Sequence, residues 1–176
     1  MVESQLVSHL HNKLIVGHRE QMGSDDKLQK YQKIIRQVES IIEEADDLTA
    51  RMASVAAIVY HSLDSFFWVG FYRLIDGELL IGPYQGTYAC QRLPKGRGVC
   101  WAAVEKKQTI IVPDVEKFPG HIACDKRSKS EIVVPCFDAD GRIFAVLDVD
   151  SEKAAAFDEI DAVNLEKIVK ILCQMY

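Results

Sequence analysis

The first third of the chain has the spacing of apolar residues that is typical of helices packed on one face. Between Ser24, which we expect to cap the first helix, and Glu44, apolar residues recur at steps of three and four. These positions are Tyr31, Ile34, Ile35 and Val38. A second stripe follows Asp46 or Asp47 and consists of Leu48, Met52, Val55, Val59 and Leu63. The pattern predicts two amphipathic helices, preceded at residues 1–23 by a loosely ordered arm without a sustained period.

From Phe66 onward the period changes to that of strands. In the run 66–72 the odd-numbered and the even-numbered positions are both apolar, which is typical of a central strand covered on both faces. Asp76-Gly77 then predicts a tight hairpin turn. The remaining predicted elements are a short helix at 99–106, strands at 78–84, 109–112, 131–137 and 142–150, and a last helix at 157–175. This order predicts an α+β domain over residues 24–176, in three layers, with terminal helices packed on an antiparallel sheet of five or six strands.

Composition and charge narrow the range of partners. The 176 residues are 48% apolar and 27% charged, as in ordinary globular proteins. With 21 Lys and Arg against 26 Asp and Glu, and no long basic run, the chain lacks the footprint of a nucleic-acid-binding protein. The start has no signal-peptide pattern, and no window approaches the roughly 18 apolar residues of a membrane-spanning helix. We therefore expect a cytoplasmic protein without membrane contact.

The second hairpin predicts a cluster of acids. An even-length turn over residues 138–141 places Glu131 opposite Asp150, and Asp148 shares their face of the sheet. Like charges this close need a proton on one member or a cationic guest, such as a ligand ammonium. The alternative is that the three acids lie in water at the strand ends. The apolar patch beside them is expected to contain Val133, Phe137, Phe144 and Val146.

The cysteines divide by their surroundings, and we expect all of them to be free thiols in the resting protein. Cys136 and Cys173 lie in an apolar strand and an apolar helix, which predicts inert core thiols. Cys90, Cys100 and Cys124 lie in or beside loops rich in Gly and Pro, where a thiol can be reached. Their spacing does not fit a closed zinc site, so we expect no metal. Three reachable thiols suit redox chemistry, and the alternative is that their placement is chance.

Several neighbours bear on the reactivity of these thiols. Cations lower the pKa of a thiol, and so does the N-terminus of a helix. Near Cys124 stand Lys126, Arg127 and Lys129, and Cys100 follows Arg97 just inside the short helix. A Cys/His hydrolase using Cys124 and His121 is an alternative, although residues three apart in a loop seldom have the required geometry.

Seven blocks of the chain, in order from about Gln32 to the C-terminus, closely resemble the free methionine-(R)-sulfoxide reductases, which are enzymes of GAF fold. The blocks are residues 67–72 (FWVGFY), 82–86 (GPYQG) with Cys90, 96–100 (GRGVC), 112–115 (VPDV), 118–124 (FPGHIAC), 131–135 (EIVVP) and 147–151 (LDVDS). The resemblance implies reduction of free methionine (R)-sulfoxide, and not of sulfoxide within polypeptides. It also implies no bound cofactor, a thioredoxin reductant fed by NADPH and thioredoxin reductase, and often a homodimer.

The resemblance also implies roles for individual residues. Cys124 would attack the sulfoxide, with Cys100 and Cys90 as candidate resolving thiols, and attack by Cys100 itself remains an alternative. The residues expected to line the substrate pocket are Trp68, Tyr72, Glu131, Asp148 and Asp150, with Asp114 as a weaker candidate. A neutral carboxylic acid, Asp150 or Glu131, would protonate the sulfoxide oxygen. The rival functions are a sensory GAF module that binds a small ligand without turnover, and a structural partner protein that associates through its helical arm.

Overall fold

The computed structural model describes residues 2–174, with side chains from residue 23 onward. Within these residues a six-stranded antiparallel sheet has the order β3-β2-β1-β6-β5-β4. The elements are α1 (Val2–Glu44), α2 (Leu48–Ser62), β1 (Trp68–Ile75), β2 (Glu78–Gln85), β3 (Arg92–Leu93), α3 (Gly98–Lys106), β4 (Ile110–Val112), the 3₁₀ turn η1 (Val115–Lys117), β5 (Ser130–Phe137), β6 (Ile143–Ser151) and α4 (Glu159–Leu172). The predicted α+β class is confirmed. The two-residue strand β3, in a segment predicted to be loop, was missed.

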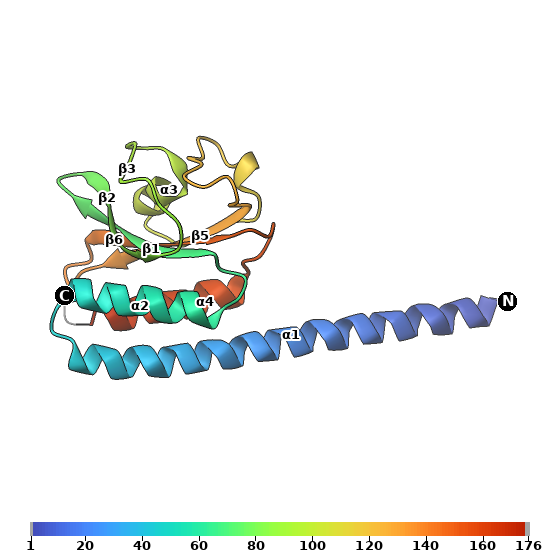
Figure 1. Cartoon of the computed structure of the whole chain (residues 1–176). Coiled ribbons are helices and arrows are strands. Elements are labelled where there is room, and N and C mark those ends of the chain that lie inside the picture. Colours follow the sequence, from blue (N-terminus) through green and yellow to red (C-terminus); the bar gives the residue numbers. More distant parts are fainter. Residues whose placement is uncertain (1, 175–176) are drawn as a thin grey trace.

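The sheet separates two apolar clusters (Figure 1). Helices α2 and α4 cover one face and α1 packs on their outer side, while α3 and the long loops lie over the other face. On the central strand β1, Val69 and Phe71 are buried against the helices, and Trp68 and Tyr72 are buried on the opposite side. The uninterrupted apolar run of β1 therefore reflects burial on both faces, as predicted.

Helix α1 differs from the prediction at its start. It does not begin at Ser24 but runs unbroken from Val2 through Gly23, and its N-terminal half projects past the sheet layers (Figure 1). A single glycine inside a helix costs only about 1 kcal/mol relative to alanine, which is too little to end the helix. The division of the chain into an arm at 1–23 and a domain from residue 24 stays a prediction.

A buried carboxylate joins α1 to α4. The Tyr31 hydroxyl donates to Asp161 Oδ1 over 2.7 Å, and the Lys27 ammonium donates to Oδ2 of the same side chain. Asp161 also accepts from the Asp158 backbone N–H and so completes the capping box that begins α4. This contact fixes where the two terminal helices meet beneath the sheet.

The second hairpin has the predicted register over most of its length. Glu131 pairs with Asp150, and Val133 pairs with Asp148. A bulge between Cys136 and Phe137 then shifts the register, so that Phe137 pairs with Ile143. The even-length turn would place Phe137 opposite Phe144, which was wrong for this reason, and Phe144 packs with the helix-side cluster instead of the apolar patch beside the acids.

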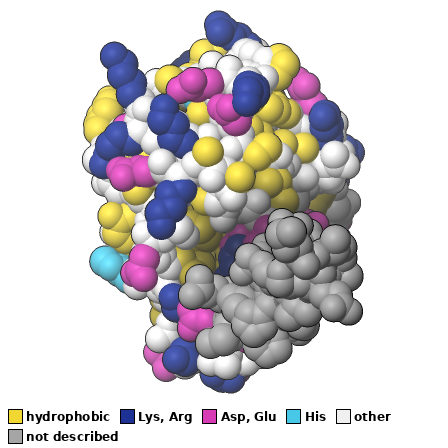
Figure 2. All heavy atoms as spheres, turned by 90° about the vertical axis from the view of Figure 1, so that its right-hand side faces the viewer, with side chains coloured by type: hydrophobic (Ala, Val, Ile, Leu, Met, Phe, Trp, Pro, Cys, Tyr) yellow, Lys and Arg dark blue, Asp and Glu magenta, His cyan; other side chains and the backbone are white. Residues whose placement is uncertain are grey.

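The surface of the described residues agrees with the charge balance of the sequence. On the face shown in Figure 2, Lys and Arg side chains are scattered among acidic and apolar ones rather than gathered in one patch. Among the described residues, no helix has both the length and the apolar character needed to cross a membrane.

Two glycines make room for the Trp68 ring on the sheet face opposite α2. A Cβ at Gly70 would lie 2.5 Å from the Trp68 ring and 2.4 Å from Tyr84 Cβ, and a Cβ at Gly86 would lie 2.7 Å from Trp68. Gly86 also has φ of +126°, which side chains rarely adopt. The Trp68 ring stacks between Tyr84 and Tyr72, with centroid distances of 5.5 and 6.1 Å. The bare backbone at Gly70 therefore fixes the position of this aromatic stack.

We predict that Gly70→Ala lowers the free energy of unfolding by about 1–3 kcal/mol, because the added methyl overpacks a closed site. Urea unfolding measures this change, and the emission of Trp68 in a Trp101→Phe background reports displacement of the ring. Gly23→Ala is the control, because a Cβ there has nothing within 4 Å and helix propensity favours alanine. Unchanged stability and unchanged emission in Gly70→Ala would contradict this role of Gly70.

Candidate active site

A pocket lies on the sheet face opposite α1, α2 and α4, between the strands, α3 and the loops that carry Cys90 and Cys124. It has a volume of about 50 Å³. The sequence-predicted residues in its lining are Trp68, Tyr72, Cys100, Cys124, Glu131, Asp148 and Asp150. The structure therefore brings together most of the candidates that lie far apart in the sequence.

Strand register places the acids of this pocket side by side. Asp150 on β6 is flanked by Trp68 on β1 and Glu131 on β5, so these three form one row across the sheet. Asp148 lies in the next row, opposite Gly70. The wall is therefore aromatic at one end and acidic at the other.

Burial sets the protonation of the three acids. Removal from water raises the pKa of Glu131 well above its ordinary value, and the neighbouring Asp148 and Asp150 raise it further. Burial and Asp150 likewise raise the pKa of Asp148. The pKa of Asp150 rises to about 6, again through burial, while the hydroxyl of Ser128 donates to Oδ1 and limits the rise. Near neutral pH the trio therefore holds both protonated and ionised carboxyl groups.

One acidic oxygen lacks a partner. Asp148 Oδ1 is buried and accepts no hydrogen bond within the described residues, which is an unusual state for a buried polar atom. Asp148 also belongs to a set of donors, with Cys100 and Glu131, that lie within 4.8 Å of one another and could ligate a metal ion. Burial raises the pKa of all three groups. Asp148 Oδ1 is the atom of this set that is left to accept a hydrogen bond from a ligand, such as an ammonium.

The cysteines depart from the sequence expectation of five free thiols. Cys90 and Cys124 form a disulfide between two loops, with Cα atoms 5.5 Å apart. Cys124 lines the pocket, while the backbone carbonyl of Cys90 accepts a hydrogen bond from the Tyr72 hydroxyl at 3.1 Å. Of the bonded pair, it is Cys124 that faces the acids.

Cys100 was expected to be reachable and to have a lowered pKa, and both expectations were wrong. It lies in the first turn of α3, yet its side chain is buried. Burial raises the pKa of the thiol, and the carboxyl groups of Asp148 and Glu131 raise it further. These effects outweigh the helix N-terminus, so Cys100 is a poor source of thiolate.

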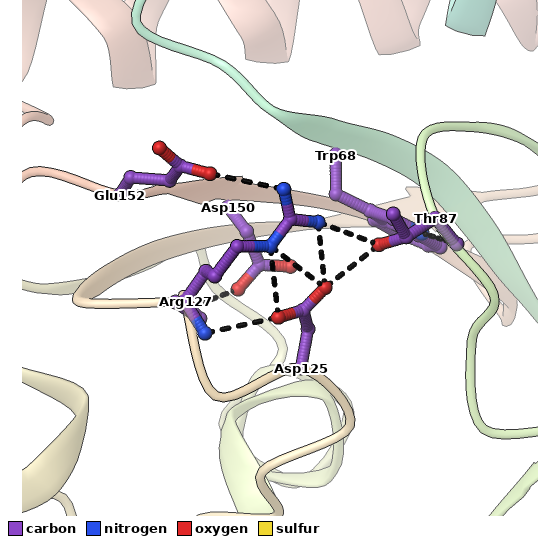
Figure 3. A network of polar contacts seen from close by, with 7 residues as sticks. Trp68, Thr87, Asp125, Arg127, Asp150 and Glu152 are labelled. Atoms are coloured by element: carbon purple, nitrogen blue, oxygen red, sulfur yellow. Dashed lines mark hydrogen bonds and ion pairs between the residues drawn. The ribbon is translucent and has the colours of Figure 1, made fainter.

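Arg127 organises the loop that follows Cys124 (Figure 3). Its guanidinium binds Asp125 at 2.8 Å, Glu152 at 3.1 Å and the Thr87 hydroxyl at 3.0 Å. Thr87 in turn donates to Asp125 and accepts, through its backbone carbonyl, from the Trp68 indole. The network ties the Cys124 loop to the segment that leads to Cys90. From the sequence, Arg127 was expected to lower the pKa of the Cys124 thiol. Its guanidinium is instead paired with the carboxylates of Asp125 and Glu152.

The remaining candidates lie at the edge of the site or outside it. Asp114 is not in the pocket lining, and it caps η1 and pairs with Lys117 at 2.9 Å. His121 lines the pocket, with Nδ1 3.6 Å from Glu131 Oε2, and burial lowers its pKa. With Cys124 in a disulfide, this geometry gives no support to a Cys/His hydrolase. Sequence reasoning missed Thr87 and Asp125, which look like ordinary solvated loop residues.

Comparison with known proteins agrees with this geometry. The protein-family model described as GAF domain matches residues 38–172 of this chain. The chain is 47% identical over 153 residues to GAF domain-containing protein A of Dictyostelium discoideum, covering 86% of this chain and 96% of that protein. It is 39% identical over 144 residues to free methionine-R-sulfoxide reductase of Escherichia coli, covering 82% and 87%.

A solved structure extends the comparison. The free methionine-R-sulfoxide reductase of Neisseria meningitidis, in complex with its substrate, superposes with a TM-score of 0.77 at 46% identity, covering 82% of this chain and 86% of that one. Sequence similarity and the fold are thus shared over most of the chain. The chain belongs to the GAF-domain family, in the group that includes the free methionine-R-sulfoxide reductases.

Proposed function

We propose that this protein reduces free methionine (R)-sulfoxide to methionine in the pocket lined by Cys124 and the three acids. The observation that carries the proposal is the placement of a disulfide sulfur and three carboxyl groups around one cavity. The relatives named free methionine-R-sulfoxide reductase support it.

The thiol steps follow from the disulfide. The Cys124 thiolate attacks the sulfoxide sulfur and forms a transient S–S bond. As that bond and the S–O bond break, the protonated oxygen passes to Cys124 as a sulfenic acid, and methionine leaves. The Cys90 thiol then attacks the sulfenic sulfur, forms the Cys90–Cys124 disulfide and releases water. Cys90 is better placed to resolve the intermediate than Cys100, which is buried among the acids.

The acids have distinct parts in this reaction. Sulfoxide oxygen needs a proton before the S–O bond can break. We assign the proton to Glu131, because burial and both neighbouring aspartates keep its carboxyl group protonated. Asp150, whose pKa is about 6, is then the carboxylate that balances the substrate ammonium at neutral pH.

Recognition of the free amino acid depends on Asp148 Oδ1, the buried oxygen that accepts no hydrogen bond within the described residues. Asp148 Oδ1 can accept a hydrogen bond from a substrate ammonium, which also offsets the charge of Asp150. A peptide nitrogen is neutral and has one hydrogen at most, so it would leave these groups uncompensated. Trp68 at the other end of the wall is placed to contact the methyl-sulfinyl group.

A new catalytic cycle begins when the Cys90–Cys124 disulfide is reduced. At about 50 Å³ the disulfide-bonded pocket is far below the roughly 300 Å³ of the smallest typical ligand sites, and we propose that the Cys90 and Cys124 loops separate on reduction to admit the substrate. Thioredoxin, kept reduced by NADPH and thioredoxin reductase, suits exchange with a loop disulfide. A thioredoxin reductant is consistent with the cytoplasmic location that we propose. A homodimer stays a prediction from the family resemblance.

We predict that the purified protein consumes NADPH through thioredoxin reductase and thioredoxin when given free methionine (R)-sulfoxide. Little NADPH consumption is expected with the S epimer, because its oxygen points in another direction. Little is expected with N-acetylmethionine sulfoxide or with a sulfoxide inside a peptide, because both lack the free ammonium. Cys124→Ser should abolish turnover. Comparable rates on all four compounds would contradict the pocket assignment, and tight ligand binding without turnover would favour a sensory GAF module.

The pH dependence of kcat/KM tests the separate roles proposed for Asp150 and Glu131. Below its pKa of about 6 Asp150 is protonated and cannot balance an ammonium, so kcat/KM should rise with pH through about 6. At higher pH kcat/KM should fall as Glu131 loses its proton. Asp150→Asn should lower kcat/KM about 10- to 100-fold and remove the limb near pH 6, because it removes the titrating group.

Asp114→Asn is the matched control, because it changes a carboxylate outside the pocket. Its profile should keep both limbs. A limb near pH 6 that persists in Asp150→Asn would show that another group titrates there.

A further inference from the structure

A second pair of thiols lies on the opposite side of the sheet from the pocket. Cys136 is on β5 and faces the helix-side cluster, and Cys173 caps the C-terminus of α4, which packs on β5. Cys173 shares a groove with Pro135 and Phe137, which lie on either side of Cys136, and each of the two thiols acts on the pKa of the other. Both are free in this structure. The fold therefore brings two unpaired sulfurs that are remote in sequence close to each other.

The two thiols differ in access. Cys136 is completely buried, whereas Cys173 is half-buried and lies in the wall of a groove of about 610 Å³. The groove lies between α4 and the end of β5, and Val169 and Phe137 also line it. A small solute can therefore reach Cys173 but not Cys136.

The contacts of Cys173 also favour its reactive form. The thiol of Cys136 and the backbone of Phe137 both hydrogen-bond to it, and these bonds lower the pKa of Cys173 despite its partial burial. The thiolate is the form of cysteine that reacts with peroxide. The accessible member of the pair is thus the one that peroxide can reach.

We propose that Cys173 is a peroxide-reactive thiol that closes a second disulfide with Cys136. The Cys173 thiolate attacks hydrogen peroxide, the O–O bond breaks, and a sulfenic acid and hydroxide result. The Cys136 thiol then attacks the sulfenic sulfur, and its proton and the sulfenic oxygen leave as water. Two thiols and one peroxide thereby give one disulfide and two waters.

This disulfide differs from Cys90–Cys124 in its oxidant and in its effect. It forms from peroxide and not from substrate, because the sheet separates it from the acidic pocket. It links the end of α4 to β5 and protects Cys173 from irreversible oxidation. The proposal does not depend on the identity of the substrate.

The test uses the Cys90→Ser/Cys100→Ser/Cys124→Ser triple variant, in which Cys136 and Cys173 are the remaining cysteines. One equivalent of hydrogen peroxide should yield a Cys136–Cys173 disulfide in non-reducing peptide mass maps, with a rise in Tm of about 5–10 °C that a reductant reverses. The matched control adds Cys173→Ser, in which Cys136 should stay a thiol.

Three results would overturn the proposal. These are a sulfinic acid on Cys173 beside an unchanged Cys136, a Cys173–Cys173 link between two chains, and no reaction of either thiol. If the triple variant does not fold, the same map is made on the wild-type protein whose Cys90–Cys124 disulfide is already closed. There, Cys136–Cys173 supports the proposal and a link of Cys173 to Cys100 contradicts it. Cys173→Ser should leave sulfoxide turnover unchanged.

Discussion

Two buried carboxyl groups and a third, half-buried one on the same face of the sheet cannot all be ionised, since each would raise the free energy of the others in a medium that screens charge poorly. The rest of the site depends on this constraint. It keeps a proton on Glu131, it leaves Asp148 with an oxygen that lacks a donor, and it makes the wall attractive to an ammonium. The same carboxyl groups suppress ionisation of Cys100, so the attacking thiolate must come from the loop that carries Cys124. The proton on Glu131, the site for the ammonium and the choice of Cys124 as nucleophile thus all follow from the grouping of these carboxyl groups.

The fold supplies that arrangement through strand register. Glu131, Asp150 and Trp68 become neighbours because β5, β6 and β1 are adjacent and antiparallel. Gly70 leaves space beside Asp148 for the Trp68 ring, so the aromatic and acidic ends of the wall meet without a gap. The thiols, in contrast, lie on loops, which can separate and close around a substrate, and the Arg127 network fixes where the two loops meet.

The sequence predicted those features that depend on local rules. The turn signal at 138–141 places the hairpin, which is why the pairing of Glu131 with Asp150 could be predicted, although a bulge between Cys136 and Phe137 is needed to reach that register. The bulge at Phe137 and the continuation of α1 through Gly23 could not, because each depends on packing rather than on a local signal. The Cys90–Cys124 bond joins loops 34 residues apart, and no spacing rule decides such a pairing. The burial of Cys100 likewise follows from the way α3 lies on the sheet, which its own sequence does not specify.

The central claim is that the acidic wall receives the ammonium of a free amino acid while its sulfur faces Cys124. A crystal structure of the Cys124→Ser variant with methionine (R)-sulfoxide tests this most directly. The account predicts an ammonium within hydrogen-bond distance of Asp148 Oδ1, a sulfoxide oxygen at Glu131 and the sulfur turned toward residue 124. A substrate with its ammonium in solvent, or with its sulfur directed at Cys100, would contradict it.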